Sequence, residues 1–231
     1  MSTIVPGATQ IRPSLPDEPP ASARFGKWLP TLLSVIAGMV DLISFLSLGI
    51  FTAHITGNIV VIGALLARHG RVNVAQILAI PVFVVAVAAT WLLAKASRKH
   101  GHNLMRVLLL VQFLLLACVL IFSVVTNPSA KPHGLMAGIA AMMAVSAMAC
   151  QFALLRLTLP VAPSTAIMTG NLTNAMLSLV MGDTSRLKAS LNLLIGFFVG
   201  CVVAAAALSP LGEWTWLFPA ALAGVIFALV K

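Results

Sequence analysis

The residues of this chain best suited to binding a solute are two copies of the tripeptide Thr-Gly-Asn, at 56–58 and 169–171, and one acidic residue, Asp41. Thr and Asn side chains compete with the backbone for hydrogen bonds and so favour helix starts, and glycine tolerates an unwound approach to a helix. A helix start presents free N–H groups and the positive end of the helix dipole. Two such starts that meet could bind a polar or anionic solute.

Other polar residues lie close to these tripeptides or within apolar segments. A lone His precedes the first tripeptide, and Ile167 occupies the equivalent place before the second, so we expect this His to form a structural hydrogen bond. The candidate binding residues are therefore Asp41, Thr52, His54, Thr56, Gly57, Asn58, Gln151, Thr165, Thr169, Gly170 and Asn171.

Asp41 has two interpretations that the sequence leaves open. It lies near the middle of an apolar segment, where a charge costs several kcal/mol unless it is paired or hydrated. It could relay a proton or cation, or contact a substrate directly. Alternatively, it accepts hydrogen bonds from Thr or from backbone N–H groups of the first broken helix and holds that helix in place. The Thr-Gly-Asn tripeptides likewise have a simpler alternative, which is ordinary helix capping at loops.

Composition predicts the class of protein. The chain is 60% hydrophobic and 8% charged, with a mean hydropathy of +1.06, which is typical of a polytopic helical membrane protein. Its net charge of +9 comes from Lys and Arg in connecting loops and at the N-terminal flank, so we expect no nucleic-acid partner. The three cysteines lack metal-ligand spacing and no catalytic motif is present, so we expect no metal, no cofactor and no enzymatic activity.

Hydropathy predicts two sets of four apolar segments. They cover 28–50, 51–66, 76–95 and 104–125, and then 134–155, 164–181, 187–208 and 214–230. A helix over 54–66 would rise only about 20 Å, against a hydrocarbon thickness of about 30 Å. Irregular backbone survives in a bilayer only when it is buried in protein or lines a wet cavity. We therefore predict an all-α membrane protein with six transmembrane helices and two re-entrant or broken half-helices.

Charge placement supports six crossings with a cytoplasmic N-terminus. Of the 14 Lys and Arg residues, only Arg68, Arg71 and Lys131 would then lie outside. Three crossings per half is an odd number, so the second half would be inverted relative to the first. The predicted organisation is a flexible tail over 1–27, a first membrane repeat over 28–126 and a second, inverted repeat over 134–231.

Four short stretches resemble the YoaK-like family of bacterial integral membrane proteins. They are GMVDLISF at 38–45, FTAHITGN at 51–58, ACQFALLR at 149–156 and MTGN at 168–171. His54 and Phe152 stand where such proteins more often carry Asn, and Asn171 stands where Thr is common. The resemblance covers nearly the whole chain after the tail. It implies a small multi-pass protein of the bacterial cytoplasmic membrane and does not indicate an activity.

The function predicted from these observations is a transporter or channel for a small polar or anionic solute. Its site would be central, built from both Thr-Gly-Asn elements with Asp41 adjacent. The alternative is a non-transporting membrane protein that scaffolds, inserts or regulates a partner, in which case the basic residues over 95–106 would matter more. Membrane lipid surrounds the protein in both cases, and either a monomer or a homo-oligomer is compatible with the sequence.

Overall fold

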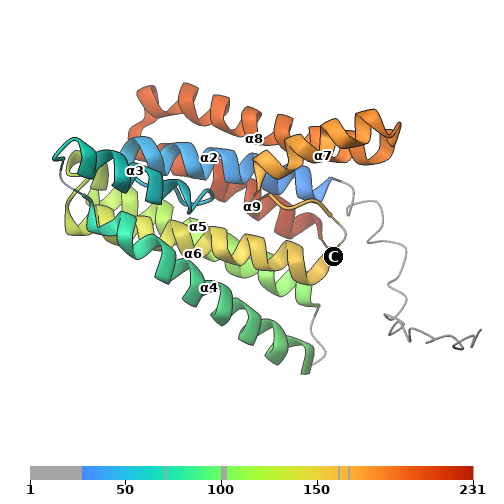
Figure 1. Cartoon of the computed structure of the whole chain (residues 1–231). Helices are drawn as coiled ribbons and strands as arrows, with labels where there is room; N and C mark the ends of the chain where they lie inside the picture. Colours follow the sequence, from blue (N-terminus) through green and yellow to red (C-terminus); the bar gives the residue numbers. More distant parts are fainter. Residues whose placement is uncertain (1–27, 71, 100–102, 161, 166, 231) are drawn as a thin grey trace, which may run out of the picture.

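The computed structural model describes residues 28–230 except 71, 100–102, 161 and 166, so the tail predicted over 1–27 lies outside the described residues. The described residues are helical and contain no strand, which confirms the predicted class. Eight α-helices and two 3-10 helices follow one another (Figure 1): α2 (Leu29–Leu48), α3 (Gly57–Ala67), α4 (Val74–Lys99), α5 (Leu104–Thr126), η1 (Pro128–Ala130), α6 (Leu135–Thr158), α7 (Met168–Val180), α8 (Thr184–Leu211), η2 (Gly212–Trp216) and α9 (Leu217–Leu229).

Five helical stretches of the described chain are long and apolar enough to cross a membrane, which supports a multi-pass membrane protein. Four are α2, α4, α5 and α6. The fifth is the stretch Thr184–Leu229, 46 residues long, which contains α8, η2 and α9. Figure 1 shows α9 running back beside the bundle to the C-terminus, because the chain turns in η2. By length and composition the count is therefore five rather than the predicted six.

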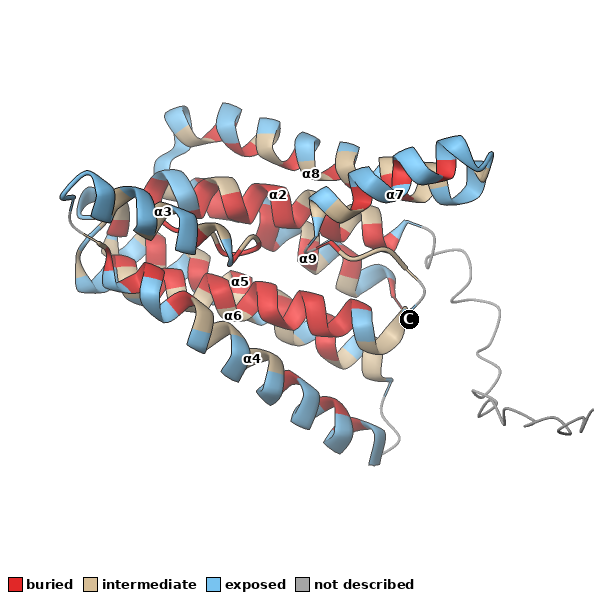
Figure 2. Cartoon of the chain, viewed as in Figure 1, coloured by how far each residue is buried: buried red, intermediate tan, exposed pale blue. Residues whose placement is uncertain are grey.

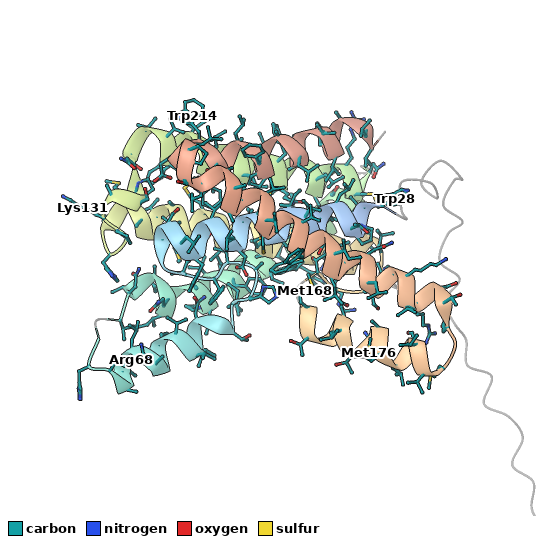
Figure 3. The ribbon with its side chains drawn as sticks, turned by 90° about the horizontal axis from the view of Figure 1, so that it is seen from above. Trp28, Arg68, Lys131, Met168, Met176 and Trp214 are labelled. Atoms are coloured by element: carbon teal, nitrogen blue, oxygen red, sulfur yellow. The ribbon has the colours of Figure 1, made fainter. Side chains whose placement is uncertain are left out.

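The two predicted short elements are short helices in the structure. Helix α3 has 11 residues and α7 has 13. At 1.5 Å per residue they rise about 17 and 20 Å, less than a hydrocarbon core of about 30 Å. Both begin near the middle of the bundle and run toward opposite ends (Figures 1 and 3): Arg68, just after α3, lies at one end, and Met176 of α7 lies toward the other.

Helices α2 and α6 form the inside of the bundle. Both are buried over most of their length, whereas few residues of α4 and α8 are buried (Figure 2). Helix α2 packs chiefly against α8, and α6 packs against α4 and α5. The exposed side chains of the outer helices are mainly apolar, which suits contact with lipid tails.

Glycines bring the backbones of α2 and α8 into direct contact. A Cβ added at Gly38 would collide with the carbonyl oxygen of Phe197, and one added at Gly200 would collide with the carbonyl oxygen of Val35. Only residues without a side chain fit there. The Gly196/Gly200 pair therefore packs within the chain, against α2. The Gly134/Gly138 pair does not, because a Cβ at Gly138 would have no neighbour within 4 Å.

We expect Gly200→Leu to separate α2 from α8 and to lower the free energy of unfolding by about 2 to 3 kcal/mol, since backbone cannot yield to an inserted side chain. Thermal unfolding of the detergent-solubilised protein measures this loss. Gly63→Leu is the matched control, because Gly63 is also helical and has open space around it. Equal stability of the two variants would contradict the close α2–α8 contact.

Candidate functional site

The carboxylate of Asp41, on α2, is the centre of the best-connected polar cluster in the membrane-spanning part. Its Oδ1 accepts hydrogen bonds from the backbone N–H groups of Thr52 and Ala53, both at 2.8 Å, and from that of His54 at 3.4 Å. Its Oδ2 lies 2.8 Å from Nδ1 of His54. Asp41 is only 4% exposed. One side chain thus satisfies N–H groups of the irregular backbone that precedes α3, as the second interpretation of Asp41 predicts.

The Asn residues of the two tripeptides act in the same way as each other. Asn58 accepts from the N–H of Phe51 at 2.9 Å and donates to its carbonyl oxygen at 2.8 Å. Asn171 donates to the carbonyl oxygen of Ser164 at 2.8 Å. In both cases the partner lies seven residues earlier in the chain. Neither α3 nor α7 has a side-chain cap, so the alternative of ordinary helix capping does not describe these residues: each Asn ties its helix to the segment before it.

Gln151, on α6, contacts the segment that precedes α7. Its Nε2 donates to the carbonyl oxygen of Leu33 at 2.9 Å and to Oγ1 of Thr165 at 3.4 Å. Its Oε1 accepts from Nε2 of Gln112 at 2.7 Å. Thr165 in turn matches Thr52, whose hydroxyl lies 3.4 Å from that of Ser44. The first segment is therefore held by a carboxylate and the second by a neutral amide.

A cavity of about 310 Å³ lies between the starts of α3 and α7. Of the predicted residues, only His54, Thr56 and Thr169 line it. The His54 side chain is 30% exposed, and both Thr residues are exposed. Met168, the first residue of α7, also lines the cavity and lies at the centre of the view in Figure 3. The other predicted residues stand behind the cavity: Gly57 and Gly170 are partly buried, and Asp41, Thr52, Asn58, Gln151, Thr165 and Asn171 are buried.

Aromatic residues complete the cavity, although none of them was among the candidate binding residues. Phe83 of α4 and Phe152 of α6 line it, with ring centroids 5.8 Å apart. Phe197 of α8 meets the His54 ring edge-on at 5.0 Å. The available signal was the equivalent placement of Phe83 and Phe197 after the two short elements. The cavity thus has aromatic walls beside its polar groups.

The first N–H groups of α3 are not free. Those of Gly57, Asn58 and Ile59 are bonded to carbonyl oxygens three residues earlier. In α7, the N–H of Asn171 is bonded to the carbonyl oxygen of Ile167, and residue 166 lies outside the described residues. The expectation of free N–H groups at the helix start is therefore wrong for α3.

The cavity offers hydrogen-bond groups of both kinds. A neutral His54 that donates from Nδ1 to Asp41 leaves Nε2 as an acceptor. The hydroxyls of Thr56 and Thr169 can donate or accept. Such a site suits a small solute with both a donor and an acceptor.

Comparison with known proteins identifies the family. The family model described as "Protein of unknown function (DUF1275)" matches residues 29–229, so this chain belongs to the DUF1275 family. Over 54 residues the chain is 44% identical to UPF0700 transmembrane protein YoaK of Bacillus subtilis (strain 168), and this match covers 23% of the chain and 24% of the relative. Both findings confirm the YoaK-like resemblance. No solved structure matches the chain.

Asp41→Ala should lower the free energy of unfolding by about 3 kcal/mol, because it leaves buried N–H groups of residues 52–54 without an acceptor. Asp41→Asn should cost less, since an amide oxygen still accepts. Thermal unfolding gives the stabilities, and hydrogen exchange at Thr52 and Ala53 reports the loss locally. The control is Arg186→Ala, which removes a side chain that is 82% exposed from an ion pair with Asp183 and leaves the Asp183 cap of α8 in place. An Asp41→Ala protein as stable as this control would refute the holding role.

Proposed function

We propose that this member of the DUF1275 family moves a small polar or anionic solute across the bacterial cytoplasmic membrane, as a channel or transporter. The observation that carries the proposal is the cavity of about 310 Å³ between the starts of α3 and α7, lined from both halves of the chain. Polar groups and interrupted helices are costly in a bilayer unless they serve a wet or solute-filled cavity. Discontinuous helices at such a site are the common plan of secondary transporters.

Helix contacts support an inverted repeat with six crossings, in which η2 and α9 form the sixth. If α2 to α5 correspond to α6 to α9, the contact of α2 with α8 has its counterpart in that of α6 with α4. The contact of α5 with α6 likewise corresponds to that of α9 with α2, and α3 with α4 corresponds to α7 with α8. The Asn58 and Asn171 ties obey the same relation. Such a repeat permits one half to rock against the other around a fixed site.

Basic residues support a cytoplasmic N-terminus. The end of the bundle where α2 begins also holds the end of α4, the start of α5, the end of α6 and the α7–α8 turn (Figure 1). These segments carry Lys95, Arg98, Lys99, Arg106, Arg156, Arg186 and Lys188. Arg68 and Lys131 lie at the opposite end (Figure 3). The positive-inside rule assigns the first end to the cytoplasm.

The difference between the two helix starts bears on the solute. The carboxylate of Asp41 faces the N–H groups before α3, whereas the neutral amide of Gln151 contacts the segment before α7, so the positive end of the α7 dipole has no facing carboxylate among these contacts. We infer that an acceptor or anionic group of the solute binds at Thr169, while a donor group binds at Nε2 of His54. The rings of Phe83 and Phe152 would contact the apolar part of the solute.

The alternative is a scaffold or accessory role for a partner protein. It is favoured by the burial of Asp41, Asn58, Gln151 and Asn171, whose hydrogen bonds hold chain segments together and leave little for a ligand. Under this alternative the cavity is a by-product of the broken helices.

Solute flux tests the site. Proteoliposomes are loaded with a defined mixture of amino acids, polyols and inorganic anions, and efflux is followed by mass spectrometry. We expect at least one solute to leave faster than from protein-free vesicles, and Thr56→Trp or Thr169→Trp to abolish the difference by filling the cavity. Thr173→Trp is the control, because Thr173 is exposed one turn further along α7 and does not line the cavity. Unchanged flux in both cavity variants would defeat the site. No flux in the wild type, together with a stoichiometric partner in a pull-down, would favour the alternative.

Cysteine labelling tests the topology. In a background without Cys118, Cys150 and Cys201, single cysteines are placed at Lys131, Arg156 and Arg186 and treated with a membrane-impermeant maleimide on intact cells. We expect labelling at 131, and labelling at 156 and 186 only after permeabilisation, because α7 returns to the side from which it enters. Opposite accessibility of 156 and 186 would make α7 an ordinary crossing.

A further inference from the structure

A second hollow opens on the side of the bundle, away from the cavity between α3 and α7. It has a volume of about 620 Å³ and lies between the start of α4, the middle of α5 and the first half of α6. Leu78, Leu115 and Met142 contribute apolar walls. Gly134 and Gly138 also line it, and Gly138 leaves open space where a side chain would otherwise stand. We call this hollow the lateral groove.

The lateral groove has the length of one membrane leaflet. Along α6 it extends from Gly134 to Ser146. Twelve residues of helix rise about 18 Å. Half of a hydrocarbon core of about 30 Å is about 15 Å. The groove therefore reaches from one membrane surface to about the middle of the bilayer.

Polarity changes along the groove in one direction. Asn73 and His133 line its outer end, and exposed Lys131 lies two residues from His133. Lys131 is at the end of the molecule in Figure 3. From Leu135 inward, the walls are apolar as far as Ser146, whose hydroxyl is bonded to the carbonyl oxygen of Met142. A basic, polar mouth above an apolar channel complements a molecule with an anionic head and a hydrocarbon tail.

The polar end of the groove is held rigid by hydrogen bonds. The side-chain amide of Asn73 donates to the carbonyl oxygens of Leu48 at 3.3 Å and Pro132 at 3.1 Å, and Gln76 donates to that of Gly49 at 2.9 Å. These bonds tie the start of α4 to the end of α2 and to the loop before α6. The groove is therefore preformed, so a ligand needs little ordering of the protein.

We propose that the lateral groove binds one anionic phospholipid, with an acyl chain along Gly134 and Gly138 and the phosphate near Lys131 and His133. The leaflet is the one at the end of the bundle that carries Arg68 and Lys131. Bound lipid would fill the space beside α6 and stabilise the contact of α6 with α4. The site is independent of the solute cavity, since the two hollows share no lining residue.

Native mass spectrometry of delipidated, detergent-solubilised protein tests this site, with palmitoyl-oleoyl phosphatidylglycerol as the probe. We expect one lipid per chain in the wild type. Gly138→Leu should lower the affinity about tenfold, which corresponds to about 1.4 kcal/mol. Because a side chain at 138 meets open space, this variant should fold, and thermal unfolding without lipid checks that it does. Gly63→Leu, in equally open space on α3, should bind like the wild type.

The headgroup is tested with palmitoyl-oleoyl glycerol, which has the same chains and no phosphate. It should bind more weakly than phosphatidylglycerol to the wild type, and Lys131→Gln should reduce that difference. Wild-type affinity in Gly138→Leu would overturn the proposal. A wild-type dimer that Gly138→Leu dissociates would also overturn it, because the groove would then be an interface between two copies of the chain.

Discussion

Backbone that leaves a helix inside a bilayer has N–H groups that lipid cannot satisfy, and every broken helix must meet this constraint. Here Asp41 meets this constraint for residues 52–54, because one of its carboxylate oxygens accepts hydrogen bonds from their N–H groups. The other oxygen orients His54, whose ring borders the solute cavity. These hydrogen bonds offset the cost of burying the carboxylate. The charge of Asp41, the segment that precedes α3 and the position of α3 therefore depend on one another.

The second half meets the same constraint with different chemistry. Gln151 contacts Thr165 where Asp41 contacts the backbone, and Asn171 reaches Ser164 as Asn58 reaches Phe51. An amide carries no charge, so the second segment is held with a smaller desolvation cost. The result is a pair of half-helices of similar shape and unequal electrostatics. One has a carboxylate facing the segment before it, and the other has a neutral amide there.

Close packing of α2 on α8 positions the residues around the cavity. Without side chains at Gly38, Gly196 and Gly200, the two backbones touch, and Ser34 adds a hydrogen bond of 2.7 Å to the carbonyl oxygen of Leu193. This contact brings Phe197 of α8 against His54. Contacts between elements from different halves of the chain thus build the cavity, and neither half could form it alone.

The sequence by itself determined the helical membrane class, the two short elements and the polar residues around them, because hydropathy, segment length and helix-start chemistry are local properties. The partners of the polar side chains followed only from the three-dimensional structure. The sequence left two interpretations of Asp41 open, and the structure places its carboxylate against the backbone of residues 52–54. Asn58 and Asn171 bond to residues seven positions earlier because the chain before each short helix turns back toward them. Gln151 reaches Leu33 because α6 packs against α2. Phe83 and Phe152 joined the cavity for the same reason: a periodic apolar pattern marks a buried helix face, but which other face it meets is decided by the packing of the whole bundle.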